Sequence, residues 1–178
     1  PFKAIHVSDT HIVRAARGDG DRKSLLAAAR HVGGMQYGER YLSEAIALSH
    51  REKALLIHTG DMIDFVSQAN LEMAERIYGA DDWFVAAGNH EYSQFVGEAK
   101  EDFAYKMRSY DEVSAHYPND LTFATRVVNG VNFVSADNVY YNFTAKQLAL
   151  LKQEVAKGLP IVFLCHVPLY VKGHYKHK

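Results

Sequence analysis

Four short clusters of polar residues follow apolar runs in this sequence and combine carboxylate, imidazole and amide side chains. They are DTH at 9 to 11, GDMID at 60 to 64, GNHE at 88 to 91, and the lone His166. Such side chains are ligands for divalent metals of intermediate hardness. A carboxylate shared by two ions would hold them about 3.5 to 4 Å apart, which suits in-line attack on phosphoesters. The clusters therefore predict a metal site.

The elements that would position these clusters are short strands alternating with helices. Apolar runs predict buried strands over residues 2 to 8, 54 to 60, 82 to 88 and 160 to 166. Apolar residues at helical spacing predict helices over Glu39 to His50, Ser67 to Tyr78, Phe95 to Tyr110 and 144 to 158. Since ligand sites in open α/β sheets lie beyond the carboxyl ends of strands, the four clusters should converge on one crevice.

A hairpin and the chain length complete the prediction of the fold class. Residues 121 to 137 form two β-rich arms around Asn129-Gly130, a dipeptide that tolerates positive φ at both turn positions. The chain has 178 residues, without an internal repeat or a linker. We therefore expect a single mixed α/β domain over residues 1–178.

Charge and composition limit the partners. With 20 Lys and Arg against 21 Asp and Glu, the net charge of -1 argues against nonspecific binding to nucleic acid or anionic membranes. No apolar run could span a bilayer, and no signal-peptide pattern is present. The single cysteine, Cys165, fits a reducing compartment. We expect a cytoplasmic protein with a small substrate, no membrane association and little affinity for nucleic acid.

Each cluster taken alone has a simpler interpretation. Asp9 could cap a turn, and Gly60-Asp61 could form an ordinary turn. Asn89-His90 could form a tight turn, and His166 could be a hydrogen-bonded histidine of the core. The occurrence of all four in this order, each after an apolar run, favours the functional interpretation.

The order of the four blocks resembles the calcineurin-like metallophosphoesterase family, whose pattern is D-x-H, G-D-x-x-D, G-N-H-[DE], a lone His and then G-H-x-H. The first four blocks are present and span nearly the whole chain. The resemblance implies that Asp9 and His11 bind one metal ion. It implies that Asn89 and His166 bind a second ion, and that Asp61 bridges both.

The resemblance also implies a fold and a reaction. His90 would stabilise the phosphoryl oxygen or protonate the leaving oxygen, and Asp64 would orient its ring. The fold would be a four-layer α/β/β/α sandwich. Two divalent ions (manganese, zinc or iron) would lower the pKa of a water, and the resulting metal-bound hydroxide would attack a small phosphomonoester, phosphodiester or nucleotide.

The fifth block of the family pattern has no match in the chain. The sequence GHYKH at 173 to 177 has two residues between its histidines, so we expect His174 and His177 to be solvated loop residues. We therefore expect a sandwich truncated at its C-terminal end, with the remaining metal ligands in a following segment. The alternatives are a non-catalytic scaffold with a degenerate site and a module that binds a single metal ion.

Residues around the motifs indicate which branches of the family the chain resembles least. Phe65 stands where phosphoprotein phosphatases of the family carry Arg-Gly, which argues against that branch. Position 11 is His rather than the Gly of the purple acid branch, which favours a redox-inactive metal pair. Phe65, Tyr92 and Phe95 lie near the motifs and could stack on a base, although packing in the core or at the rim is the expected role.

Overall fold

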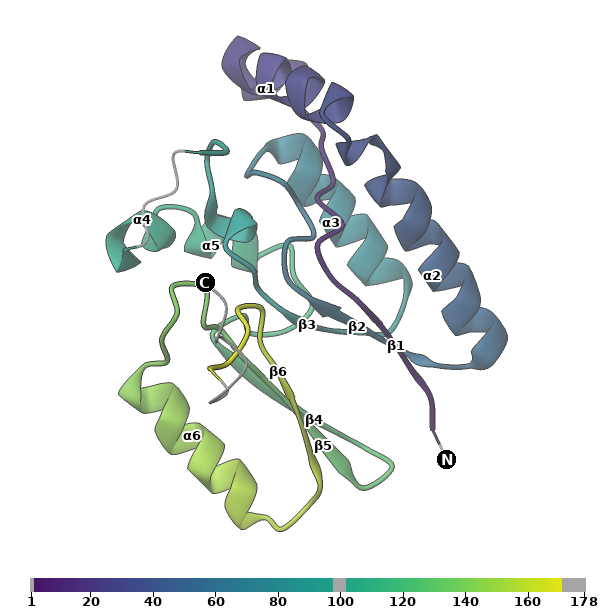
Figure 1. Cartoon of the computed structure of the whole chain (residues 1–178), viewed down its shortest axis with the longest axis vertical. Coiled ribbons are helices and arrows are strands. Elements are labelled where there is room, and N and C mark those ends of the chain that lie inside the picture. The colour runs from purple at the N-terminus through teal and green to yellow at the C-terminus, as the bar shows by residue number, and fades with distance from the viewer. Residues whose placement is uncertain (1, 98–101, 171–178) are drawn as a thin grey trace.

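Two three-stranded sheets form the centre of the molecule (Figure 1). The structure is a computed structural model that describes residues 2–97 and 102–170. The first sheet is parallel, with strands β1 (Ala4–Val7), β2 (Leu55–Thr59) and β3 (Trp83–Ala86) in that order. In the second sheet β5 pairs with antiparallel β4 and parallel β6, and the strands are β4 (Phe123–Val128), β5 (Val131–Ala136) and β6 (Ile161–Leu164).

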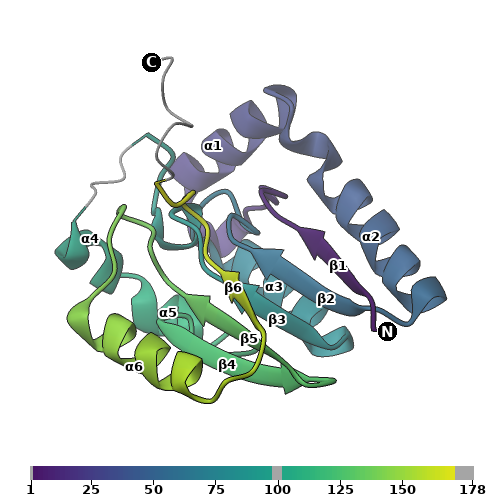
Figure 2. The ribbon, with the colours of Figure 1, turned by 60° about the horizontal axis from the view of Figure 1, so that its bottom comes forward.

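Helices cover the outer faces of both sheets. The α-helices are α1 (Asp21–Val32), α2 (Gly38–Glu52), α3 (Gln68–Ala80), α4 (Phe103–Met107), α5 (Tyr110–Ser114) and α6 (Ala145–Ala156). The short 3₁₀ helices are η1 (Arg17–Asp19), η2 (Met35–Tyr37) and η3 (His90–Tyr92). Figure 1 and Figure 2 show α2 and α3 beside the first sheet and α6 beside the second. The order of layers is therefore α/β/β/α, as the family resemblance implies, and the mixed α/β class predicted from the strand and helix patterns is confirmed.

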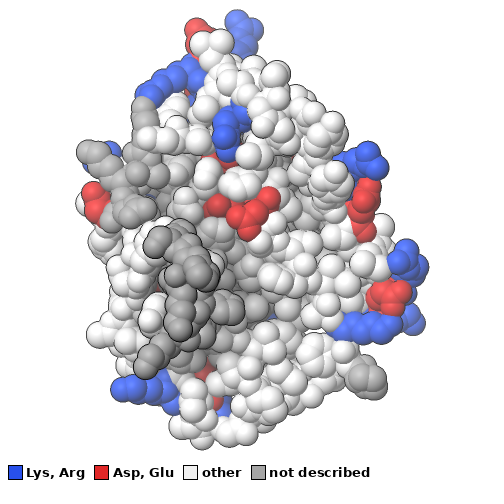
Figure 3. Space-filling view, in the orientation of Figure 1, with Lys and Arg blue, Asp and Glu red and all other residues white. Residues whose placement is uncertain are grey.

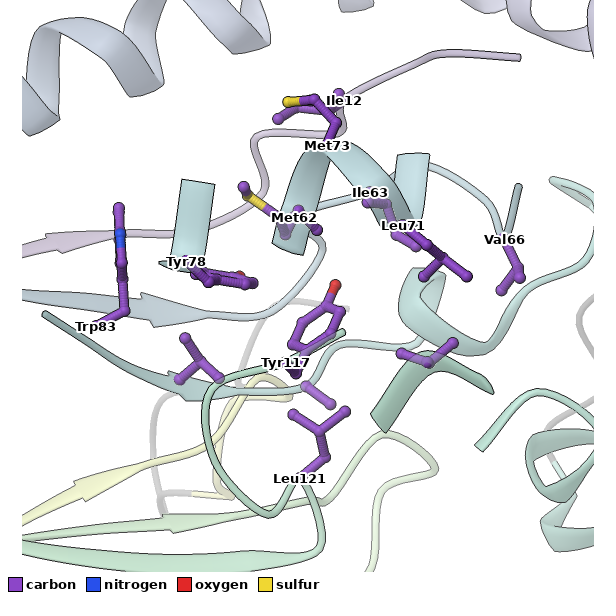
Figure 4. Close-up of a cluster of buried hydrophobic side chains, with 14 of the residues drawn as sticks. Ile12, Met62, Ile63, Val66, Leu71, Met73, Tyr78, Trp83, Tyr117 and Leu121 are labelled. Atoms are coloured by element: carbon purple, nitrogen blue, oxygen red, sulfur yellow. The ribbon is translucent and has the colours of Figure 1, made fainter. Parts of the chain in front are cut away.

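The two faces of the first sheet pack into two separate cores. Because successive residues of a strand point to opposite faces, Leu56 faces the helices while Ile57 faces the second sheet, where it packs with Phe133. Figure 4 shows the core on the helix side, where Tyr78 and Trp83 pack with ring centroids 5.6 Å apart. Each such buried side chain contributes about 1.5–3 kcal/mol of hydrophobic stabilisation, which fixes the strands whose ends carry the polar clusters.

Most of the elements predicted from local patterns are confirmed. All four predicted strands are present in slightly shorter form. Asn129 and Gly130 turn the β4–β5 hairpin with φ values of 50° and 80°, as the Asn-Gly pair predicts. The hydroxyl of Thr144 accepts the N–H of Gln147 at 3.2 Å, and the Gln147 side chain accepts the N–H of Thr144, so a capping box begins α6.

The predicted helix from Phe95 to Tyr110 is wrong. Gly97 has a φ of 83°, which ends any helical path there, and the carboxylate of Asp102 caps a new helix by accepting the N–H of Tyr105 at 2.6 Å. Two five-residue helices, α4 and α5, replace the predicted single one.

Helix α1 was not predicted at all. None of its residues is buried, and two of the four on its half-buried face, Lys23 and Arg30, are charged, so the face lacks the continuous apolar stripe that predicts a core-facing helix. The signals that could have revealed it are the alanine-rich run and the pair Gly33-Gly34 that follows its last residue.

Candidate metal and active site

The chain that leaves β1 runs beside the chain that leaves β2. The N–H of Asp9 donates to the carbonyl of Gly60 at 3.0 Å, and the N–H of His11 donates to the carbonyl of Asp61 at 2.9 Å. Because β1, β2 and β3 are parallel, their carboxyl ends lie at one edge of the sheet. The first three polar clusters therefore meet there, as the sequence predicts.

Three residues of these loops adopt a left-handed backbone. Asp9, His11 and Asp61 have φ values of 55°, 44° and 56°. Such a conformation costs about 1–3 kcal/mol for a residue other than glycine, and it tends to occur at functional sites. Residues two apart in a strand point to the same side, and the left-handed turns at Asp9 and His11 bend the chain after β1 so that both side chains lie beside Asp61.

Two glycines allow the loops to approach closely. A β-carbon on Gly60 would lie 2.4 Å from the backbone nitrogen of Gly88 and 2.7 Å from Nδ1 of His166. A β-carbon on Gly88 would lie 2.1 Å from Oδ1 of Asp61. Glycine is therefore required at both positions for His166, which follows β6 of the second sheet, to join the three clusters of the first.

The carboxylate of Asp61 lies between two histidines. Its Oδ2 is 3.7 Å from Nε2 of His11 and 3.4 Å from Nε2 of His166. Oδ1 of Asp9 is 3.9 Å from Nε2 of His11. In the described part of the chain two sets of donor atoms could each hold a metal ion: His11, Asp61 and His90, and Asp9, Asp61 and His166. Asp61 belongs to both sets.

His166 is fixed in the orientation that a ligand requires. Its Nδ1 donates to the carbonyl of Thr59 at 2.8 Å, which leaves Nε2 facing Asp61. Burial opposes protonation of this ring, but the hydrogen bond and charge of Asp61 raise the pKa of His166 to about 9. The pKa of His11 is also raised, because the interactions with Asp64, Asp61 and Asp9 outweigh its burial.

His90 contacts the site through its backbone and its ring. Its N–H donates to Oδ1 of Asp61 at 3.0 Å, and its Nδ1 lies 2.6 Å from the carbonyl oxygen of Asp64. Because a carbonyl can only accept, Nδ1 carries the hydrogen and Nε2 remains for other contacts. The rings of His90 and His11 are nearly perpendicular, with centroids 4.6 Å apart.

Asp64 makes stronger contacts than the sequence predicted. Its Oδ1 is 3.4 Å from Nδ1 of His90 but only 2.9 Å from Nδ1 of His11. Arg30 of α1 binds both carboxylate oxygens, at 2.6 and 2.7 Å. The Asp64 carboxylate thus bonds the ring of His11, while the backbone carbonyl of Asp64 bonds the ring of His90. Arg30 is a site residue that sequence reasoning missed because α1 was not predicted.

These contacts predict how Asp64 affects stability at low pH. Burial alone would raise the pKa of Asp64, but Arg30 and His11 lower it from 3.8 to about 2. A lowered carboxyl pKa stabilises the fold above pH 4 and loses this effect as the pH falls through about 2. When the pH is lowered from about 5 to about 2, the free energy of unfolding of the metal-free protein should therefore fall. This fall should be about 2 kcal/mol larger than the fall in the Asp64→Asn variant. Urea unfolding at several pH values measures this difference, and an equal loss in both proteins would contradict it.

The carboxylate of Glu91 links the backbones of the second and third clusters. Glu91 is fully buried, and its carboxylate accepts the backbone N–H groups of Asp61, Met62 and Gly88 at 2.8, 2.7 and 2.6 Å. The hydroxyl of Tyr117 donates to it at 3.1 Å. Burial and the charge of Asp61 raise the pKa of Glu91. The sequence placed Glu91 in the GNHE block but assigned it no role; the structure gives it the role of holding the two loops together.

The remaining predicted residues are less constrained. Asn89 directly precedes His90 at the start of η3, and among the described residues its side chain makes no hydrogen bond to another predicted ligand. Phe65 and Tyr92 are fully buried, which confirms their packing role. Phe95 is half-buried, and the guanidinium of Arg22 lies 3.7 Å from its ring centroid. His174 and His177 lie outside the described residues.

Comparison with known proteins decides the family. Among protein-family models, the one described as calcineurin-like phosphoesterase matches residues 2–178. The chain belongs to the calcineurin-like phosphoesterase family. This confirms the resemblance seen in the four clusters, and the two sheets flanked by helices agree with it. Comparison with curated proteins finds no match.

The donor set of this calcineurin-like phosphoesterase fits divalent metal ions. Carboxylates and imidazoles of Asp9, His11, Asp61 and His166 converge within a few ångströms at one edge of the sheet. The family is one of metal-dependent phosphoesterases, which implies a small phosphoester as substrate. Among the described helices, none is both long and apolar enough to cross a membrane.

The raised histidine pKa values predict that metal binding by this phosphoesterase releases protons. With a pKa raised to about 9, His166 holds a proton near neutral pH in the metal-free protein, and an imidazole must be deprotonated to bind a metal. The pKa of His11 is raised as well. The apparent affinity for Mn²⁺ or Zn²⁺ should therefore rise with pH and level off above about pH 9. Calorimetry in buffers of different protonation enthalpy counts the protons, and His166→Asn should release about one fewer. Binding without proton release would contradict the expectation.

Proposed function

We propose that this chain is a metal-dependent phosphoesterase that hydrolyses a small phosphomonoester, phosphodiester or nucleotide at a dinuclear centre. The observation that carries the proposal is the position of the Asp61 carboxylate, whose Oδ2 lies within 3.7 Å of His11 and 3.4 Å of His166. Asp61 also belongs to both sets of donor atoms that could hold an ion, so its carboxylate could serve two ions. Manganese, zinc and iron all suit this set of oxygen and nitrogen donors.

In this proposal the five ligands divide between two ions. Asp9 and His11 hold one ion, Asn89 and His166 hold the other, and Asp61 contacts both. When bound, the ions would supply positive charge for the phosphoryl oxygens and would activate a water for attack. The protein contributes the arrangement: Glu91 holds the loops that carry Asp61 and Asn89, and Asp64 fixes the ring of His11.

His90 is proposed to act on the substrate. The carbonyl of Asp64 fixes Nδ1 of His90, so a protonated ring presents its Nε2–H beside Asp61 and His11. From there it can donate a proton to the leaving oxygen or a hydrogen bond to the phosphoryl group. The carboxylate of Asp64 lies 3.4 Å from the same Nδ1.

One experiment tests the proposed function against a non-catalytic scaffold. The protein is loaded with Mn²⁺ or Zn²⁺, freed of excess metal, and assayed for bound metal and for hydrolysis of p-nitrophenyl phosphate and its bis ester. Two ions per chain together with turnover would support the phosphoesterase, and the preferred ester would separate monoesterase from diesterase activity. The absence of both bound metal and turnover would favour the scaffold.

A further inference from the structure

A cavity of about 320 Å³ lies between the end of β1 and the start of α2. Its lining includes Ser8, Asp9, Met35, Tyr37, Tyr41 and Leu42, which we call the aromatic subsite. The volume lies at the lower end of the range for small-molecule sites. The cavity is large enough for a ring but not for an extended ligand.

Asp9 joins this cavity to the proposed metal centre. Its Oδ1 lies 3.9 Å from Nε2 of His11, and its Oδ2 accepts a hydrogen bond from the hydroxyl of Ser8 on the cavity wall. The Asp9 side chain remains 54% exposed. Only the side chain of Asp9 would therefore separate a molecule in the aromatic subsite from the ion that Asp9 would bind.

The walls of the cavity are apolar and aromatic. Tyr37 and Tyr41 are 48% and 59% exposed, and their ring centroids are 6.2 Å apart. Both rings therefore remain accessible to a ligand. Met35 and Leu42 add apolar surface, and no lysine or arginine lines the cavity in the described part of the chain. Figure 3 shows that the surface over the start of α2 is mainly uncharged.

The backbone around the cavity is closely fitted. A β-carbon on Gly38 would lie 1.9 Å from the carbonyl oxygen of Thr10, so the first turn of α2 rests directly on the loop that carries Asp9. Gly34 has a φ of 115°, a conformation that turns the chain from α1 into η2, where Tyr37 lies. The two tyrosines are therefore held at a fixed place relative to Asp9.

We propose that the aromatic subsite binds the ring of the substrate's leaving group while the phosphoryl group lies at the metal ligands. The substrate class would be a phosphoester of an aryl or heteroaromatic group. Tyrosine and methionine side chains favour a flat apolar group. The carboxylate of Asp9 and the lack of cations in the wall disfavour a second phosphate there. This inference rests on the proposed function, because only bound phosphoryl groups would place the ring at Asp9.

Binding of two substrate analogues tests the subsite without relying on turnover. Calorimetry on the Mn²⁺-loaded protein compares phenylphosphonate, which carries a ring, with methylphosphonate, which does not. The intact site should bind phenylphosphonate about tenfold more tightly, and the double variant Tyr37→Ala, Tyr41→Ala should lose this preference while its affinity for methylphosphonate stays the same. The matched control is Tyr141→Asn, since Tyr141 is 72% exposed away from the cavity and asparagine tolerates its φ of 65°.

The outcomes separate the subsite from the proposed function. Equal affinity for the two phosphonates in the unaltered protein, including no detectable binding of either, would overturn the subsite, as would an equal loss of preference in Tyr141→Asn. Turnover of phenyl phosphate is measured in parallel. If the ring preference depends on the two tyrosines but phenyl phosphate is not hydrolysed, the subsite stands and the catalytic proposal fails.

Discussion

Asp61→Asn should abolish hydrolysis of an aryl phosphate and weaken both metal sites together. The carboxylate is 5% exposed and lies between His11 and His166, so one negative charge would serve two cations. The asparagine amide keeps an oxygen for the N–H of His90 but removes that charge. We expect turnover to fall by about 10³-fold or more, together with a loss of both ions rather than one.

Metal analysis and steady-state kinetics on the same preparation measure the effect of Asp61→Asn. Asp21→Asn is the matched control, because Asp21 is an exposed aspartate at the start of α1, away from the site. The control should keep its metal content and its activity. Loss of a single ion in Asp61→Asn, with the other bound at unchanged affinity, would mean that Asp61 is a ligand to one ion only.

His90→Ala should reduce turnover by about 10²- to 10⁴-fold and leave the metal content unchanged. The ring is held at Nδ1 by the carbonyl of Asp64, and its backbone N–H, which alanine retains, already satisfies Asp61. The loss should be smaller for an ester with a very good leaving group if His90 donates a proton. Asp64→Asn should reduce turnover less, because it removes charge beside the ring but leaves the carbonyl in place.

Kinetics on two esters of different leaving-group pKa, with metal analysis of each variant, test the role of His90. His116→Ala is a matched control, since His116 pairs with Glu75 on the surface. His90 also belongs to a set of donor atoms with His11 and Asp61. Loss of one ion in His90→Ala would therefore make it a ligand, and unchanged turnover would remove it from the mechanism.

Elements with strong local signals could be predicted from the sequence. Strands β2 and β3 are buried on both faces, and their sequences, LLIHT and WFVA, are accordingly mainly apolar. The hairpin at Asn129-Gly130 and the cap at Thr144 depend on residues adjacent in sequence. The convergence of the first three polar clusters follows from the parallel order of β1, β2 and β3, which places their carboxyl ends at one edge.

Features that depend on contacts between distant segments could not be predicted. Helix α1 has no buried residue; the contact of Arg30 with Asp64 and that of Arg22 with Phe95 link it to segments far away in sequence. The bond between Asp64 and His11 exists only because the loops after β1 and β2 lie side by side. Local patterns contain no information about such approaches, and the same holds for the backbone groups that Glu91 binds.

The claim that Asp61 bridges two ions is tested most directly by electron paramagnetic resonance of the Mn²⁺-loaded protein. Two Mn²⁺ ions that share a carboxylate are magnetically coupled, so the unaltered protein should give the spectrum of a coupled pair at two ions per chain. Asp61→Asn, with Mn²⁺ added to the same total concentration, should lose the coupled signal. A spectrum of isolated Mn²⁺ in the fully loaded, unaltered protein would contradict the dinuclear centre and with it the proposed mechanism.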